Sequence, residues 1–214
     1  MRKLKPSQIV GTALLVGGVT IISVAAYNMT VGDELARVQQ QAAAETVPLA
    51  GADGETGTLD GKQLEIGDVF AKLYVPRFGE DYVRNIAEGT SLSKVLNTVG
   101  IGHYSGTAMP GEVGNFALAG HRSGNGGPMR DIDKFVPGDL VFVETASTRY
   151  TYKFVEGTTV KPSGIGVIAP VPVGMATAVE GGKYLTMTSC TPIGVNTDRI
   201  IAWFELVEQQ PASN

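Results

Sequence analysis

The amino end of the chain carries an uncharged segment that restricts its structure more than any other feature. No charged residue occurs in residues 6–32, and the apolar heart of this segment, residues 9–27, reads IVGTALLVGGVTIISVAAY. A helix that spans a bilayer needs roughly 20 apolar residues, and helical hydrogen bonding satisfies the backbone polar groups that lipid cannot. The sequence therefore predicts a transmembrane helix over residues 9–27.

The charges around this segment predict its orientation. Arg2, Lys3 and Lys5 precede it, whereas acidic residues follow it directly. Because basic residues stay on the cytoplasmic side, residues 1–8 are expected to form a cytoplasmic tail, and the rest of a single-pass protein of the cell membrane is expected outside. A cleaved signal peptide is the alternative, since residues 24–26 are small. The apolar run exceeds the roughly 7–15 residues of a signal peptide, which favours a retained anchor.

Composition then divides the remaining chain. Residues 28–62 are expected to form a stalk and linker: 33–46 are rich in helix formers, and 50–61 are glycine-rich and acidic, as in a flexible tether. A single folded domain is expected over residues 63–208, with a short tail, 209–214. The net charge of -4 provides no broad basic surface for nucleic acid phosphates, so nucleic acid is an unexpected partner.

The expected domain is rich in short apolar segments separated by glycine and proline. This pattern predicts an all-β fold, with one helix over residues 91–99. Sequence periodicity leaves a sandwich and a small closed barrel equally open. The expected strands are residues 69–75, 115–120, 139–145, 149–160, 184–190 and 199–206.

The chain has one cysteine, Cys190, at the end of an expected strand. An unpaired cysteine in an exported domain forms an intermolecular bridge or acts as a reactive thiol, although a buried inert cysteine is the simpler reading. A catalytic thiolate needs a histidine nearby. His121 follows the strand NFALAG and is favoured over His103, whose surroundings, GIGHYSG, read as a loop. Arg199 opens the next strand, where a guanidinium can stabilise an anionic intermediate.

Two of these segments carry a resemblance to a known family. The segment TMTSCTPIGVNTDR resembles the signature of the sortases, in which Thr-Leu-x-Thr-Cys is followed some eight to nine residues later by Arg, and ALAGHR resembles the segment with their histidine. The resemblance extends over about residues 67–206. The chain departs from the signature at Met187, where Leu is usual, and at Ser189, where Thr is usual.

The segment GHYSGTAMPGEVGNFALAGHR most resembles the class E sortases of actinobacteria. That resemblance implies an eight-stranded closed β-barrel. It also implies that Tyr104 helps to select Ala rather than Pro at the second position of a Leu-Ala-x-Thr-Gly signal. A tyrosine hydroxyl can bind backbone at a residue whose amide N–H is present in Ala and absent in Pro.

The resemblance further implies a membrane-anchored cysteine transpeptidase with the catalytic residues Cys190, His121 and Arg199. Tyr104, Thr188 and Ser189 are expected to bind substrate. The expected partners are surface proteins with an LAXTG or LPXTG sorting signal and an amine of peptidoglycan or of its precursor lipid II. No cofactor is expected, and two scattered histidines without a cysteine pair make a structural zinc site improbable.

Two other functions compete with this interpretation. An anchored extracytoplasmic β-barrel could be a binding module with an inert buried cysteine. An L,D-transpeptidase also uses cysteine and histidine, but it places Ser and His or Gly around its cysteine and Arg within a few residues. The sequence Cys-Thr-Pro at residues 190–192 does not match that pattern.

Overall fold

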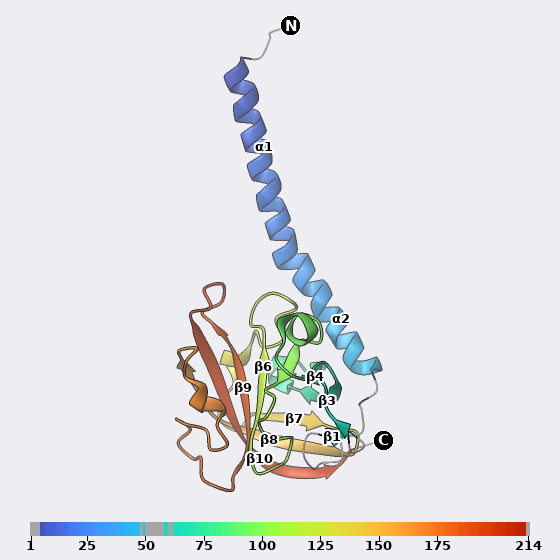
Figure 1. The fold of residues 1–214 in the computed structure, drawn as a ribbon. Coiled ribbons are helices and arrows are strands. Elements are labelled where there is room, and N and C mark those ends of the chain that lie inside the picture. The colour runs from blue at the N-terminus through green and yellow to red at the C-terminus, as the bar shows by residue number, and fades with distance from the viewer. Residues whose placement is uncertain (1–4, 48, 50–57, 60–61, 213–214) are drawn as a thin grey trace.

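The computed structural model describes residues 5–47, 49, 58–59 and 62–212. The apolar segment forms the helix α1 (Pro6–Tyr27), in which no residue is buried. A π-helical turn (Asn28–Gly32) leads from α1 into α2 (Asp33–Thr46), and together they form one long helix (Figure 1). With a mean hydropathy of 2.2 in its most apolar window, this helix is long and apolar enough to cross a membrane.

Eight strands close into a barrel, as expected from the resemblance. Their order around the barrel is β10-β8-β7-β3-β4-β5-β6-β9, and β9 pairs with β10 to complete the ring. The pairs β4/β5 and β6/β9 are parallel, and the others are antiparallel. The barrel strands are β3 (Val69–Tyr74), β4 (Val83–Glu88), β5 (Ile101–His103), β6 (Gly114–Gly120), β7 (Leu140–Glu144), β8 (Thr148–Val160), β9 (Lys183–Thr191) and β10 (Asp198–Pro211).

Several shorter elements lie between or beside the barrel strands. The strands β1 (Thr58–Leu59) and β2 (Lys62–Gln63) pair with each other outside the barrel. Three 3-10 turns lie between strands, at Pro76–Phe78, Ile132–Lys134 and Ile165–Ile168. The predicted helix over residues 91–99 is a shorter π-helical turn (Leu92–Leu96), whose first residues are capped by the Ser91 hydroxyl.

All six strands expected from the sequence are present. The barrel also contains β4 and β5, which were not expected. The expectation of a loop at GIGHYSG was wrong, because residues 101–103 of that segment form β5. Strand β4 escaped prediction because its sequence, VRNIAE, mixes charged and apolar residues without alternation. All six of its residues are nevertheless buried.

Two apolar clusters show which way the strands face. Inside the barrel, Phe70, Phe116, Leu185 and Phe204 belong to one core cluster. On the outside of β9 and β10, Trp203 belongs to a second cluster that also holds side chains from the β8–β9 connection. Because successive side chains of a strand point to opposite faces, these clusters assign the neighbouring positions of β9 and β10 as well.

Helix α2 lies against the barrel beside β4. Residues 33–46 form the expected helix, but they are more than a stalk, because Gln40 and Ala44 are buried. The expected tether falls largely outside the described residues, at 50–57 and 60–61. At the other end, β10 continues to Pro211, beyond the expected end of the domain at residue 208.

Candidate active site

The pairing of β9 with β10 places Cys190 and Arg199 side by side. They are direct partners in the antiparallel register. Residues directly opposite in an antiparallel pair share one face of the sheet. Leu185 and Met187 point into the barrel, so Cys190, at an odd number of positions further along the strand, points outward. Arg199 lies two residues before the outward-facing Ile201 in β10, so it points outward as well. Cys190 is a partly exposed free thiol.

The parallel pairing of β6 with β9 brings His121 to the same place. Ala119 is the partner of Thr188, and His121 and Cys190 each follow two residues later. Phe116 and Leu118 point into the barrel, so the alternation directs His121 outward. The three predicted catalytic residues therefore lie on one outer face, on adjacent strands.

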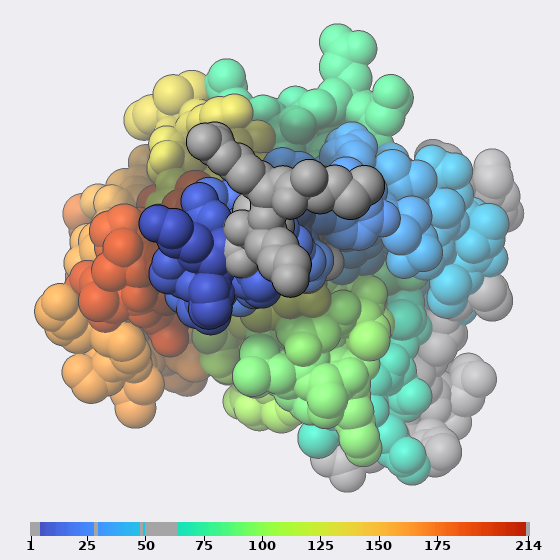
Figure 2. Space-filling view, turned by 90° about the horizontal axis from the view of Figure 1, so that it is seen from above, coloured from blue at the N-terminus to red at the C-terminus, as the bar shows by residue number. Residues whose placement is uncertain are grey.

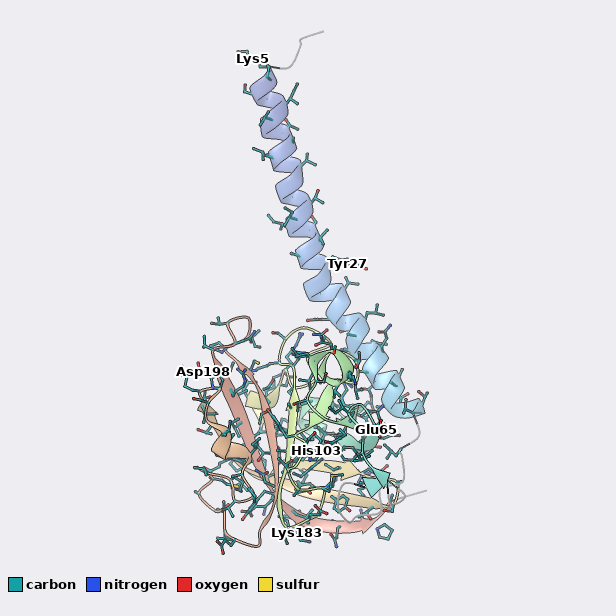
Figure 3. All side chains as sticks on the ribbon, viewed as in Figure 1. Lys5, Tyr27, Glu65, His103, Lys183 and Asp198 are labelled. Carbon is teal, nitrogen blue, oxygen red and sulfur yellow. The ribbon has the colours of Figure 1, made fainter. Side chains whose placement is uncertain are left out.

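This face is at the end of the barrel from which α1 rises. Figure 3 shows Lys183, where β9 begins, at the far end of the barrel, and Asp198, where β10 begins, at the end nearer to α1. Cys190 is near the end of β9 and therefore lies at the end that carries Asp198. Seen from above in Figure 2, the orange-red region of the β9–β10 connection lies at the left of this end of the molecule, and the light-blue α2 lies at the right.

His121 is half-buried and has a defined partner. Its Nε2 lies 2.8 Å from Asn97 Oδ1, an oxygen that can only accept, so Nε2 carries the proton and Nδ1 of a neutral ring is the free base. Loss of water around the ring lowers the pKa of His121 below its ordinary value of 6.5, and the negative charge of Asp33 partly opposes this effect. The neutral imidazole is therefore favoured at neutral pH.

The guanidinium of Arg199 rests on the β9–β10 loop. Its Nη1 donates to the backbone carbonyl oxygens of Asn196 at 3.3 Å and Asp198 at 2.9 Å. Two backbone bonds leave most of its five N–H donors for a substrate. An oxyanion that forms when a thiolate attacks a carbonyl group would bind the guanidinium more strongly than these neutral backbone carbonyl groups do.

The three predicted substrate-binding residues differ in their surroundings. Tyr104 Oη lies 3.0 Å from Thr188 Oγ1, which also donates to the Leu118 carbonyl at 3.2 Å. Ser189 is buried and donates to the carbonyl of Gly120 at 2.7 Å. The Ser189 hydroxyl thus ties β9 to β6 one residue before both Cys190 and His121, whereas Tyr104 and Thr188 share the outer face with the thiol.

Arg122 contributes to the site and was not singled out from the sequence. Its side chain is only 7% exposed, and its Nη1 donates to Thr191 Oγ1 at 2.8 Å, next to Cys190. Its Nη2 pairs with Asp133 at 2.6 Å and its Nε donates to the Arg130 carbonyl at 3.3 Å. Arg122 therefore connects the residue after the histidine to the residue after the cysteine. Its position directly after His121 in ALAGHR was the available signal.

His103, the histidine that the sequence favoured less, lies in a buried hydrogen-bond network. It is buried, and its Nδ1 lies 2.6 Å from Glu88 Oε2, while its Nε2 lies 2.9 Å from Thr107 Oγ1. The Thr107 hydroxyl also donates to the carbonyl of Tyr104 at 2.8 Å. This buried network supports the turn that carries Tyr104. Within the described residues, no three His, Cys, Asp or Glu side chains gather as a metal site would require.

Comparison with known proteins agrees with this geometry. A family model described as the Sortase domain matches residues 73–207. The chain is 36% identical to Sortase SrtE1 of Streptomyces coelicolor, over 97% of this chain and 59% of that protein, so it spans less than two thirds of that relative. It is 32% identical to Sortase SrtE2 of the same organism, over 93% of this chain and 79% of that protein.

Solved structures lead to the same family. The crystal structure of Sortase E1 from Streptomyces coelicolor with a tripeptide in the active site matches 68% of this chain and 91% of its own, with 40% identity and a TM-score of 0.63. Sortase E from Streptomyces avermitilis matches 69% of this chain and 93% of its own, with 38% identity and the same TM-score, 0.63. The family model spans the strands that carry the cysteine, the histidine and the arginine. The chain belongs to the sortase family.

Proposed function

We propose that this chain is a membrane-anchored class E transpeptidase that attaches surface proteins to peptidoglycan. It cleaves an LPXTG-like sorting signal, in its LAXTG form, between Thr and Gly. It then transfers the acyl group to the amine of a cell-wall precursor such as lipid II. Helix α1 is the single-pass anchor, and the catalytic barrel of residues 63–208 lies outside the cytoplasm. The single observation that supports this proposal is the strand register, in which Arg199 is the partner of Cys190, and Ala119 and Thr188, each two residues before His121 and Cys190, are partners.

The acylation step uses all three residues. His121 first takes the proton of the Cys190 thiol and becomes an imidazolium. The thiolate attacks the carbonyl carbon of the signal threonine, and a C–S bond forms as the carbonyl oxygen becomes an oxyanion. Arg199 donates to that oxyanion and stabilises it. The C–N bond to glycine then breaks, and His121 gives its proton to the departing amine. The product is a thioester between Cys190 and the threonine.

The transfer step reverses these roles. The acceptor amine attacks the thioester carbonyl while His121 removes its proton, and Arg199 again stabilises the oxyanion. Collapse of the intermediate breaks the C–S bond, forms the new amide and frees Cys190. Tyr104 and Thr188 lie on the same face and are proposed to bind the signal peptide, with Tyr104 selecting Ala at the second position. Ser189 is also proposed as a substrate contact, through the strand edge that it fixes.

The exposure of Cys190 favours this function over a binding module with an inert cysteine. A buried thiol would react with iodoacetamide only after denaturation, whereas the partly exposed Cys190 should react in the native protein.

Transfer of a Leu-Ala-x-Thr-Gly peptide to a soluble amine tests the proposal. Cys190→Ala should lower turnover at least about a thousandfold, and His121→Ala about a hundredfold or more. Arg199→Lys keeps the charge but loses the planar fork and should cost about ten- to a hundredfold. Arg77→Lys, at an arginine that pairs with Asp139 elsewhere on the barrel, is the control. Normal transfer by Cys190→Ala would refute the assignment.

A further inference from the structure

Helix α2 is attached to the segment that carries the proposed acid-base residue. We call residues 121–130, which run from His121 to Arg130, the His121 loop. In Figure 1, α2 descends from α1 along the upper side of the barrel. Gln40, in the middle of α2, is 5% exposed. Most buried polar groups are hydrogen-bonded, so the partner of the Gln40 amide nitrogen identifies what the helix holds, whereas Gln40 Oε1 has no partner among the described residues.

Two residues of α2 bind the His121 loop. Gln40 Nε2 donates to the carbonyl of Asn125 at 3.0 Å. About two turns earlier in the helix, Asp33 Oδ2 accepts from the backbone N–H of Gly124 at 3.2 Å and from Arg130 Nη2 at 3.3 Å. The side chain of Asp33 is only 16% exposed, so these contacts to a charged group are partly shielded from water.

The contacts continue to His121 through one side chain. Asn125 Nδ2 donates to Asn97 Oδ1 at 3.3 Å, and His121 Nε2 donates to the same oxygen at 2.8 Å. The position of Asn97 therefore depends on both partners. A change in the loop at Asn125 would alter the hydrogen bond that orients the imidazole.

The glycines of the loop allow α2 to approach closely. Gly126 has a φ of +79°, and a Cβ at this position would lie 2.9 Å from the backbone nitrogen of Arg37 in α2. A side chain would therefore have to displace the helix. The neighbouring Gly124, Asn125 and Gly127 also have positive φ. Within the run SGNGGP, the glycine at position 126 thus reflects close contact with the helix.

We propose that α2 is a positioning element of the active site, in which Asp33 and Gln40 hold the His121 loop and thereby orient the His121 imidazole. The catalytic importance of that orientation rests on the function proposed above. Because α2 continues directly from α1, the same contacts fix the acid-base residue relative to the proposed membrane anchor. Deletion of residues before the barrel would then change catalysis as well as localisation.

Several titratable or charged side chains belong to the segments packed around His121. Asp33 faces it from α2, Arg122 follows it in the chain, and Arg130 ends its loop. Cys190 and Arg199 come from β9 and β10, and Lys94 lies in the π-helical turn before Asn97. Among these, the carboxylate of Asp33 favours the protonated imidazole and raises the pKa of His121 against the effect of burial. Loss of that carboxylate should lower the pKa of His121 further.

The first test compares four variants of the full chain in nanodiscs. Asp33→Asn and Gln40→Ala should each lower kcat for peptide transfer about tenfold while KM changes less than about twofold, because the acid-base step depends on histidine geometry. The matched controls are Glu34→Gln and Gln39→Ala, two exposed neighbours in the same helix. Controls and test variants that share one kcat would overturn the proposal.

The second test does not depend on enzymatic activity. The chain has only two histidines, so NMR of histidine-labelled full-length protein in micelles resolves His121, which the variant His121→Gln identifies by its missing signal. Asp33→Asn should shift the His121 titration to lower pH, and Glu34→Gln should leave it in place. Equal titration in the two variants contradicts the proposal even if the enzyme is active. Failure of the wild-type chain to transfer a peptide would instead count against the proposed function.

Discussion

At the scale of single residues, the hydroxyl of Tyr104 is a central polar group of the proposed substrate face. It lies 3.0 Å from Thr188 Oγ1, two residues before the thiol. The backbone of Tyr104 is held by its N–H, which donates to the Ala117 carbonyl at 2.9 Å, and by the Thr107 hydroxyl, which donates to the Tyr104 carbonyl at 2.8 Å. A hydroxyl that is carried by a fixed backbone and bound at its own oxygen can recognise a peptide amide more selectively than a mobile one.

Tyr104→Phe should therefore reduce the preference for Ala over Pro at the second signal position about five- to tenfold, the value of one hydrogen bond. Paired kcat/KM measurements on Leu-Ala-x-Thr-Gly and Leu-Pro-x-Thr-Gly peptides give this ratio. Tyr74→Phe removes a hydroxyl that contacts Glu144 instead and serves as the control. An unchanged ratio in Tyr104→Phe would exclude Tyr104 from signal selection.

The residues of the candidate site could be predicted to different extents. Cys190 and the two histidines stood out because such residues are rare in this chain, the expected strand ends favoured His121 and Arg199, and the resemblance then supported both. Asn97 offered no such signal, and Arg122 offered only its position directly after His121, because neither residue type is rare in this chain. Their roles depend on partners such as Thr191 that only the fold brings near.

At the scale of elements, β4 and β5 show how buried polar pairs stabilise the barrel. Glu88 in β4 accepts hydrogen bonds from His103 at 2.6 Å and from Ser105 at 2.5 Å. Burial by itself raises the pKa of Glu88, but these two hydrogen bonds and the nearby His103 outweigh it and lower the pKa below the ordinary 4.5. The folded state therefore prefers ionised Glu88 more strongly than the unfolded state does.

This difference predicts the acid sensitivity of the fold. A depressed folded-state pKa contributes stability above about pH 4.5, and that stability is lost as the pH falls through the folded-state value. Glu88→Gln should destabilise the protein by about 1 to 3 kcal/mol at pH 7 and by less at pH 3.5. Thermal unfolding across this range measures the effect, with the exposed Glu80→Gln as control. A constant difference in Tm between wild type and Glu88→Gln would contradict this account.

The same elements show where prediction from sequence failed. Strands such as β6 and β9 were recognisable because they carry apolar runs, whereas β4 buries Arg84, Asn85 and Glu88. Polar residues in a strand normally indicate exposure, but here Arg84 donates to Gln41 of α2 and Glu88 accepts from His103, while Asn85 Oδ1 is buried without a hydrogen-bond partner among the described residues. The packing of α2 escaped prediction for a related reason. Its buried residues are Gln40 and Ala44, which do not form an apolar stripe.

At the scale of the whole molecule, the long helix and the barrel form one continuous structure. The proposed anchor leads into α2, α2 binds the His121 loop, and the proposed catalytic face lies at the end of the barrel nearer to α1 (Figures 1 and 3). This arrangement suits substrates that are themselves held at a membrane surface, because the reacting groups then meet at a fixed height.

The most direct test of the central claim is the mass of the protein during turnover. Wild-type protein mixed with a Leu-Ala-x-Thr-Gly peptide and quenched in acid should gain the mass of the fragment ending in threonine, and peptide mapping should place this addition on Cys190. The addition should disappear when an acceptor amine is supplied. Cleavage of the signal without any addition to Cys190, or with an addition elsewhere in the chain, would contradict the account.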